Sequence, residues 1–179
     1  MISRMDQQKG VDLAVEALEQ AIFKDWQAIL LGTGNPELEE ACRKLERDYP
    51  DRIRAAIRFD AKLSRRMYAG GDILLMPSRY EPCGLAQMMA MRYGCVPLAR
   101  ATGGLKDTIV DADSDVKHST GFLFEPATGA ALAQALERAL AVYADKKRWQ
   151  AIQVRGMGLD FSWEKSALAY VLLYKELLK

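Results

Sequence analysis

Short apolar runs alternate along this chain with longer segments whose apolar residues recur every three or four positions. The runs have the length of buried strands, and the periodic segments are typical of helices with one buried face. The predicted strands cover residues 26–31, 53–59, 72–76, 96–99 and 121–124. Residues 1–4 have the character of a strand end that enters a loop. Strands that alternate with helices predict an α/β fold built on an open, doubly wound parallel sheet.

The predicted helices cover about residues 11–22, 38–49, 64–70, 84–93, 132–143, 147–157 and 163–178, with a further one after residue 104. Ser162 can cap the last of them. That last helix is unusual, because residues 167–174 are apolar around its whole circumference, whereas a surface helix keeps a polar face. Two interpretations stay open. Either the helix is buried on two sides within this domain, or it covers a second domain.

Two polar loops follow consecutive strands in the centre of the chain. The strand at 72–76 ends at Pro77, and a loop from Ser78 to Pro82 carries one acid, Glu81. After a helix and a short strand comes a glycine-rich loop that begins at Thr102. Loops at the carboxyl ends of parallel strands are where ligands bind in such sheets. One acidic loop and one glycine-rich loop therefore predict a site for a sugar and a phosphate.

Glu81 is the acid that the sequence marks most clearly for a chemical role. Pro82 pushes it into an extended conformation. A carboxylate fixed there can accept hydrogen bonds from sugar hydroxyls or stabilise a developing cationic centre, although an acid that only braces its loop fits equally well. Gly84 and Leu85 are expected to begin the following helix, which would leave their N–H groups as free donors.

Cations and glycines at two other turns fit a phosphorylated ligand. Arg4 and Lys9 flank a loop and a helix start, a combination that suits a diphosphate, although solvated surface residues fit the pattern too. Gly103 and Gly104 would let a phosphate approach the backbone, or simply form a turn. Phe59, just after a strand, is either a core residue or a platform on which a base can stack.

Composition excludes several other classes of protein. With 179 residues the chain fits one domain with a substantial core. Its net charge of +1, from 25 basic and 24 acidic residues, gives no footprint for nucleic acid or an anionic membrane. Three cysteines without a C-x-x-C pair indicate neither a disulfide framework nor a zinc site. No apolar run approaches the ~18 residues of a membrane span, and no signal peptide is visible. A reduced compartment is therefore expected.

Four stretches together resemble the C-terminal half of bacterial and plant starch/glycogen synthases. They are residues 3–10 (SRMDQQKG), 77–85 (PSRYEPCGL), 102–108 (TGGLKDT) and 160–163 (DFSW). They occur in the family's order over essentially the whole chain. The resemblance implies a Rossmann-like domain, residues 1–179, that forms the nucleotide-sugar-binding C-terminal half of a two-domain GT-B glycosyltransferase.

The resemblance also implies an activity and its partners. The family transfers glucose from ADP-glucose, or from UDP-glucose in some members, to the non-reducing end of an α-1,4-glucan. It retains anomeric configuration and needs no metal or other cofactor. The family's N-terminal domain, which supplies a K-x-G-G loop and a histidine near the reacting sugar, is not found in this chain. The domain by itself is therefore expected to bind donor weakly and turn over little, in the cytoplasm or in a plastid.

Residue roles follow from the same resemblance. Arg4 and Lys9 would clamp the donor diphosphate. Phe59 would stack on the nucleobase, and Glu81 would contact the glucosyl group near the reacting carbon. Many related retaining enzymes carry a second acid eight residues after the first, but here that position is Met89, as is usual in the starch/glycogen branch.

Two sets of backbone N–H groups complete the implied site. One set would bind glucose hydroxyls and the other would hold the phosphate. The first set is Cys83, Gly84 and Leu85, and the second is Thr102, Gly103, Gly104 and Leu105. Two alternatives remain: a retaining glycosyltransferase of the same fold with a different donor, and a non-catalytic assembly module that docks a partner through its last helix.

Overall fold

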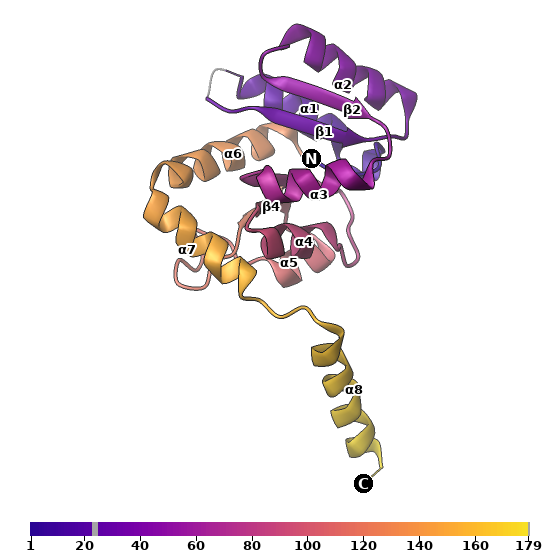
Figure 1. Ribbon diagram of the computed structural model, residues 1–179, viewed down its shortest axis with the longest axis vertical. Helices are drawn as coiled ribbons and strands as arrows, with labels where there is room; N and C mark the ends of the chain where they lie inside the picture. The colour runs from indigo at the N-terminus through magenta and orange to yellow at the C-terminus, as the bar shows by residue number, and fades with distance from the viewer. Residues whose placement is uncertain (23–24, 179) are drawn as a thin grey trace.

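All five strands are parallel in the computed structural model, which describes residues 1–22 and 25–178. They form two separate pieces of sheet (Figure 1). In the first piece, β1 (Ala28–Gly32) pairs with β2 (Ile53–Ile57). In the second, the order is β3 (Ile73–Met76), β4 (Val96–Arg100) and β5 (Phe122–Phe124). The predicted α/β class with a parallel, helix-flanked sheet is confirmed.

Residues 1–5 form a short extended segment beside β1, the amino-terminal stub. Ile2 bridges Leu31 and Met5 bridges Gly34, both in the parallel sense. The Ser3 amide donates to the Leu31 carbonyl at 3.1 Å. Residues 2 and 5 therefore lie alongside β1 in the parallel sense without forming a strand of the sheet, and the chain then enters η1.

Helices cover the sheet pieces, and their ends are fixed by local capping. They are η1 (Gln7–Lys9), α1 (Val11–Gln20), α2 (Pro36–Asp48), α3 (Ala61–Gly70), α4 (Ala86–Tyr93), α5 (Gly103–Thr108), α6 (Gly129–Ala144) and α7 (Lys146–Met157). Among the helices with a hydrogen bond at the N-cap, α3 and α6 differ most from their predicted starts. Each begins three residues earlier than predicted. Asp60 accepts from the Leu63 amide at 2.8 Å, and Thr128 accepts from the Ala131 amide at 3.2 Å. Apolar spacing alone does not reveal such caps.

One hydrophobic core joins α1, α6 and both pieces of sheet. Its members include Leu30 of β1, Leu98 of β4 and Phe122 of β5, each no more than 2% exposed. Leu18 of α1 and Leu132 of α6 belong to the same cluster. The divided sheet is thus held together by side chains on at least one of its faces.

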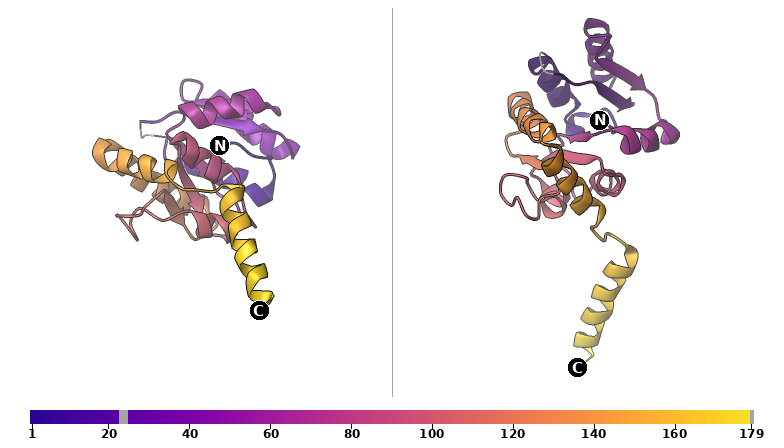
Figure 2. Two further views of the ribbon diagram at one scale, coloured as in Figure 1. Left: turned by 60° about the horizontal axis from the view of Figure 1, so that its bottom comes forward. Right: turned by 60° about the vertical axis from the view of Figure 1, so that its left-hand side comes forward.

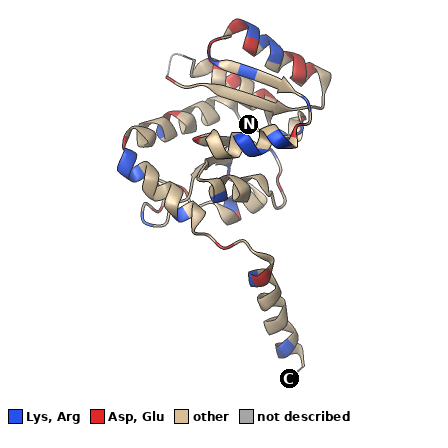
Figure 3. Cartoon of the chain, in the orientation of Figure 1, with Lys and Arg blue, Asp and Glu red and all other residues tan. Residues whose placement is uncertain are grey.

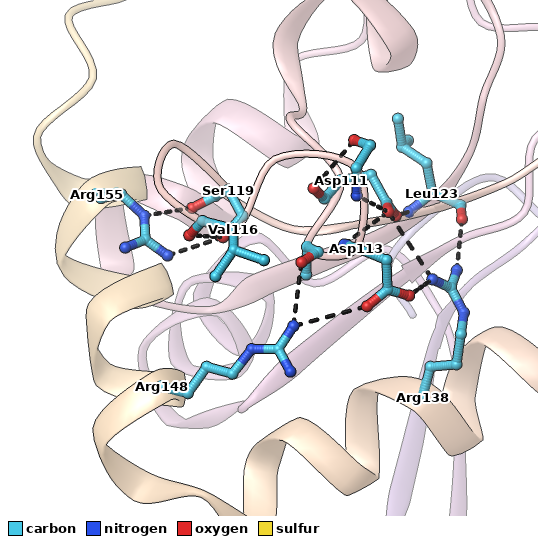
Figure 4. Close-up of polar contacts among 10 residues, drawn as sticks. Asp111, Asp113, Val116, Ser119, Leu123, Arg138, Arg148 and Arg155 are labelled. Atoms are coloured by element: carbon cyan, nitrogen blue, oxygen red, sulfur yellow. Dashed lines mark hydrogen bonds and ion pairs between the residues drawn. The ribbon is translucent and has the colours of Figure 1, made fainter.

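Arginines from α6 and α7 fix the long loop before β5 (Figure 4). Arg138 donates to the Leu123 carbonyl at 2.7 Å and pairs with Asp113. Arg148 donates to the Ala112 carbonyl at 3.1 Å, and Arg155 donates to the Ser119 carbonyl at 2.7 Å. The loop is therefore anchored by charged side chains along its length.

The last helix, α8 (Trp163–Leu177), stands away from the rest of the molecule (Figures 1 and 2). Ser162 caps it as predicted, accepting from the Lys165 amide at 3.4 Å. None of its residues is buried, so the interpretation that it is buried on two sides within this domain is wrong. Figure 3 shows charged residues only near its two ends, and the residues between them are mostly apolar. Within the described residues, no helix is long and apolar enough to cross a membrane.

Candidate functional site

The loops that follow the amino-terminal stub and β3 touch each other through their backbones. Gly10, with φ of +67°, lies so close to the Pro77 carbonyl that an added Cβ would be 2.1 Å from its oxygen. The Arg79 amide donates to the Gln8 carbonyl at 2.8 Å. This contact joins the two pieces of sheet at their carboxyl ends, where the sequence predicts a site.

Lys9 and Glu81 meet at this junction. The Lys9 Nζ lies 2.5 Å from the Glu81 Oε2, and the Ser78 hydroxyl donates to the same oxygen at 3.2 Å. Glu81 is only 7% exposed. A carboxylate with so little access to water needs a counter-charge and hydrogen bonds, and both are supplied here. Because the two residues are 72 positions apart, the fold brings together the acid and one of the two cations that the sequence singles out.

Arg4 is placed differently from Lys9. Its side chain is 70% exposed and pairs with Asp6 at 3.4 Å, a surface contact that holds it weakly. The structure does not bring it into contact with Glu81. The two cations therefore differ: Lys9 is fixed against the acid, whereas Arg4 lies at the exposed side of the same loop.

The glycine-rich loop packs onto the acid loop. The Gly104 amide donates to the Glu81 and Pro82 carbonyls, each at 3.1 Å. A Cβ on Gly103 would lie 2.1 Å from the Glu81 carbonyl oxygen, and one on Gly104 would lie 2.0 Å from that of Cys83. These glycines are thus needed for close approach of one loop backbone to another.

This packing changes what the glycine-rich loop offers to an anion. The Thr102 amide donates to Arg100 at 2.9 Å and the Leu105 amide to Thr102 at 3.1 Å, while that of Gly104 is bonded to the acid loop. Among these four predicted donors, only the Gly103 N–H lacks an acceptor within the described residues. Three of the four amides are thus bonded within the chain in this conformation, and their role in holding a phosphate stays a prediction.

The amides after Glu81 remain available. Helix α4 begins at Ala86, not at Gly84 as predicted, because Gly84 has a left-handed φ of +72° and Leu85 is the N-cap. Within the described part of the chain, the N–H groups of Cys83, Gly84 and Leu85 have no hydrogen-bond acceptor. They form a short run of free donors immediately beside the buried acid.

A small cavity of about 120 Å³ lies at this junction. Lys9, Ser78, Glu81, Gly84 and Leu85 are among its lining residues. The volume is below the range of about 300–1,000 Å³ that is usual for small-molecule sites. A larger cavity of about 720 Å³ lies between β1 and β3 and contains none of these residues.

Comparison with known proteins places the chain in a family. Residues 1–153 match the family model described as "Glycosyl transferases group 1". The chain belongs to this family. A glycogen synthase from Anaeromyxobacter sp. (strain Fw109-5) is 51% identical to this glycosyltransferase-family chain over 177 residues, which are 99% of the chain and 37% of that relative. The chain thus spans little more than a third of such a relative.

Two solved structures resemble this glycosyltransferase-family chain over most of its length. The catalytic domain of starch synthase IV from Arabidopsis thaliana, bound to ADP and acarbose, is 37% identical with a TM-score of 0.87, covering 98% of this chain and 37% of that one. A C-terminal domain of a glycosyl transferase group 1 family protein from Francisella tularensis is 25% identical with a TM-score of 0.66. It covers 86% of this chain and 78% of that domain.

Phe59 of this glycosyltransferase-family chain lies apart from the other predicted site residues. It follows β2 and is 87% exposed, so the alternative that it is a core residue is wrong. It lines neither of the two cavities. A flat ring held in solvent is consistent with stacking on a base, and that role stays a prediction.

Three side chains that sequence reasoning missed hold the acid loop in place. Arg79 binds Asp12 of α1 through two hydrogen bonds of 2.8 and 2.7 Å, which lower the pKa of the Asp12 carboxyl. Arg100, at the end of β4, donates to the Ser78 carbonyl at 2.7 Å and also to that of Arg79. In the sequence, the only sign that Arg100 holds the loop is that it is a charged residue at the end of an otherwise apolar strand.

Gln87 performs the same function on the other side of the loop. It is fully buried, and its Nε2 donates to the Cys83 and Gly84 carbonyls at 3.0 and 3.1 Å. The same nitrogen reaches the Thr108 hydroxyl of α5 at 3.2 Å. Gln87 thus links the loop that carries the free amides of residues 83–85 to α5, the helix of the glycine-rich loop. The available signal was a glutamine among the methionines and alanines of α4, on the face of that helix that is buried.

Among the described residues, no group of three or more His, Cys, Asp or Glu side chains is arranged to hold a metal ion.

Proposed function

We propose that this chain is the nucleotide-sugar-binding C-terminal domain of a glycogen or starch synthase, with ADP-glucose as its donor. The observation that carries the proposal is the contact between Lys9 and Glu81 beside the free amides of residues 83–85. It puts a cation, an acid and hydrogen-bond donors in one place at the carboxyl ends of parallel strands. Those are the groups that a sugar diphosphate requires.

The chemistry assigns a different task to each group. When the bond between the anomeric carbon and the diphosphate breaks, negative charge grows on the departing phosphate and positive charge grows on the sugar ring. A fixed cation such as Lys9 then stabilises the transition state more than the ground state. The Glu81 carboxylate is suited to the developing positive charge. The amides of Cys83, Gly84 and Leu85 are suited to sugar hydroxyls.

Arg4 and the Gly103 amide take the outer part of the diphosphate in this proposal. Arg4 is mostly exposed, and its weak pairing with Asp6 leaves it free to turn toward a ligand. The Gly103 N–H is the one amide of the glycine-rich loop without an acceptor in the described structure. Phe59 would stack on the adenine.

Transfer of glucose to an α-1,4-glucan, with retention, requires more than this chain in our proposal. The cavity at the site, about 120 Å³, is too small for a nucleotide sugar and fits one wall of a wider cleft. An N-terminal domain would supply the opposite wall, and the exposed apolar surface of α8 would pack against it. The chain by itself should then bind donor weakly and turn over little.

Calorimetric titration of the chain with ADP, ADP-glucose and UDP-glucose tests the proposal. We expect weak binding of ADP and ADP-glucose, and weaker binding of UDP-glucose. Lys9→Ala should lower the ADP affinity about tenfold or more, while Lys147→Ala, an exposed lysine on α7, should leave it unchanged. Equal affinities in the two variants, or no binding at all, would contradict the proposal. Preference for another nucleotide sugar would favour a related glycosyltransferase.

A second candidate function is supported by α8 alone. Its apolar surface would suit a non-catalytic assembly module that docks a partner chain. Sedimentation of the chain separates this function from the first, because stable self-association together with no nucleotide affinity would favour the assembly module.

A further inference from the structure

One buried side chain holds two carbonyl groups of the loop that follows Glu81. Gln87 is fully buried, and its Nε2 donates to the Cys83 carbonyl at 3.0 Å and to the Gly84 carbonyl at 3.1 Å. Among the described residues, no other donor bonds to either carbonyl. The orientation of these two peptide units therefore depends on a single glutamine amide.

The two carbonyls in turn set the direction of two N–H groups. The Cys83 carbonyl belongs to the same peptide unit as the Gly84 N–H, and the Gly84 carbonyl belongs to the same unit as the Leu85 N–H. No peptide bond in the described part of the chain is cis, and in a trans unit the carbonyl and the N–H point in opposite directions. Both N–H groups thus point away from Gln87. Gly84 and Leu85 line the small cavity at the junction, whereas Gln87 does not.

The backbone at Gly84 makes this double contact possible. Gly84 has a left-handed φ of +72°, and Leu85 follows in the right-handed region with φ of −117° and ψ of −26°. Neighbouring residues of opposite hand turn successive N–H groups to one side and form a concavity lined by donors. A Cβ on Gly84 would lie 2.5 Å from the Gln87 Oε1. The glutamine amide therefore fills the space that a side chain at position 84 would need.

The oxygen of the same amide is left without a partner. The Gln87 Oε1 is buried and accepts no hydrogen bond from the described residues. A buried acceptor of this kind lowers stability, and a methionine of similar length would avoid it. Turning the amide over would only place the oxygen against the two carbonyls. The glutamine therefore fits a role in orienting the loop better than a role in packing alone.

We propose that Gln87 is a positioning residue that makes the site select a nucleotide sugar over the bare nucleotide. It turns the Gly84 and Leu85 N–H groups toward the hydroxyls of the bound glucosyl group, whereas Lys9 and Arg4 hold the diphosphate without contacting it. This inference rests on the proposed function for the identity of the ligand. The orientation of the two N–H groups follows from contacts within the chain and does not rest on that function.

Calorimetric titrations with ADP and ADP-glucose test the selection in the parent chain, in Gln87→Met and in Gln153→Met. Methionine keeps the length of glutamine but cannot donate. Gln153→Met is the matched control, because Gln153 of α7 also donates to a loop carbonyl, that of Gly94, at 2.7 Å. Gln87→Met should lower the affinity for ADP-glucose about tenfold, through two weakened hydrogen bonds, and that for ADP by less than about twofold. Gln153→Met should change neither affinity.

Nuclear magnetic resonance tests the orientation without a ligand. In the parent chain, ¹⁵N relaxation should give order parameters of about 0.85 at Gly84 and Leu85, the value of a rigid backbone, and in Gln87→Met they should fall below about 0.6. Addition of ADP-glucose to the parent chain should shift the amide signals of these two residues, and addition of ADP should not.

Three results would overturn the proposal: mobile Gly84 and Leu85 amides in the parent chain, equally rigid amides in Gln87→Met, or equal losses of ADP and ADP-glucose affinity in that variant. If Gln87→Met does not fold, Gln87→Asn replaces it, because its side chain is one methylene shorter and cannot reach both carbonyls. A parent chain that binds neither nucleotide would refute the proposed function and the selection together. The order parameters would then still decide whether Gln87 orients the two amides.

Discussion

The two ends of the divided sheet are held in different ways. At the carboxyl ends of the strands, loops from both pieces touch through their backbones and through Lys9, Glu81 and the Arg79–Asp12 pair. At the amino ends, β1 and β3 face each other across a groove of about 720 Å³, which leucines line together with Arg66 and Asp72. The candidate site is therefore fixed by contacts between loops and not by a continuous sheet beneath it.

This difference has a consequence for how the site tolerates change. Backbone contacts leave no space for a side chain, so substitutions at the carboxyl end should be costly even where no ligand is involved. The amino end is bordered by side chains, and it should respond instead to charge. Four predictions test this contrast, from the largest expected effect to the smallest.

Gly10→Ala should have the largest effect. A Cβ at this position would lie 2.1 Å from the Pro77 carbonyl oxygen, and the φ of +67° is unfavourable for any other residue. We expect the free energy of unfolding to fall by about 3–5 kcal/mol in urea titrations. Gly70→Ala is the matched control, because nothing lies within 4 Å of its added Cβ, and it should be neutral or stabilising by up to about 1 kcal/mol. Similar losses in both variants would show that the loop contact is unimportant.

Lys9→Ala should have the next largest effect on stability. It leaves the 7%-exposed Glu81 without its cation. We expect a loss of about 2–3 kcal/mol, less than for a fully buried pair because the Lys9 side chain keeps some contact with water. Adding Glu81→Gln should restore part of that loss. Arg4→Ala should cost less than about 1 kcal/mol, since that side chain is 70% exposed. Equal losses for the two cations would remove the distinction drawn between them.

These residues also mark how far the sequence alone could lead. Apolar periodicity is a local property, so it predicted the order and type of nearly all elements. The resemblance placed Lys9 and Glu81 in one site, but no spacing could reveal that they form an ion pair. Gly103 and Gly104 indicated a close approach to the backbone without indicating its partner, which is another loop in this conformation. Arg79 and Asp12 were missed because each resembles an ordinary surface charge.

The third prediction concerns pH and the amino end of the sheet. Burial lowers the pKa of the Met1 amino group from 8.0 to about 6. Between these values the unfolded chain binds a proton that the folded chain does not, so stability rises with pH. The free energy of unfolding should be about 1–2 kcal/mol higher at pH 8 than at pH 6, below the full effect of such a shift because Met1 is partly exposed. An amino-terminally acetylated chain should lose this pH dependence, and an unchanged profile would contradict the assignment to Met1.

Removal of α8 should have the smallest effect on the stability of the rest of the chain. Its apolar circumference predicted either burial in this domain or contact with another one. The sequence indicated that this apolar surface should be covered, but it could not indicate by which part of the protein. In the structure none of its residues is buried, although Leu168, Leu172 and Tyr174 are large apolar side chains.

A chain that ends at Asp160 should therefore unfold with a free energy within about 0.5 kcal/mol of the full chain. Leu136→Ala, in the core on α6, is the contrasting variant and should cost about 2–5 kcal/mol. Exchange of the α8 amides should be fast in the full chain, because a lone helix of 15 residues is marginal in water. A loss of more than about 1 kcal/mol on truncation would mean that α8 packs on this domain after all. A negligible loss would leave its apolar surface available to a partner such as the proposed N-terminal domain.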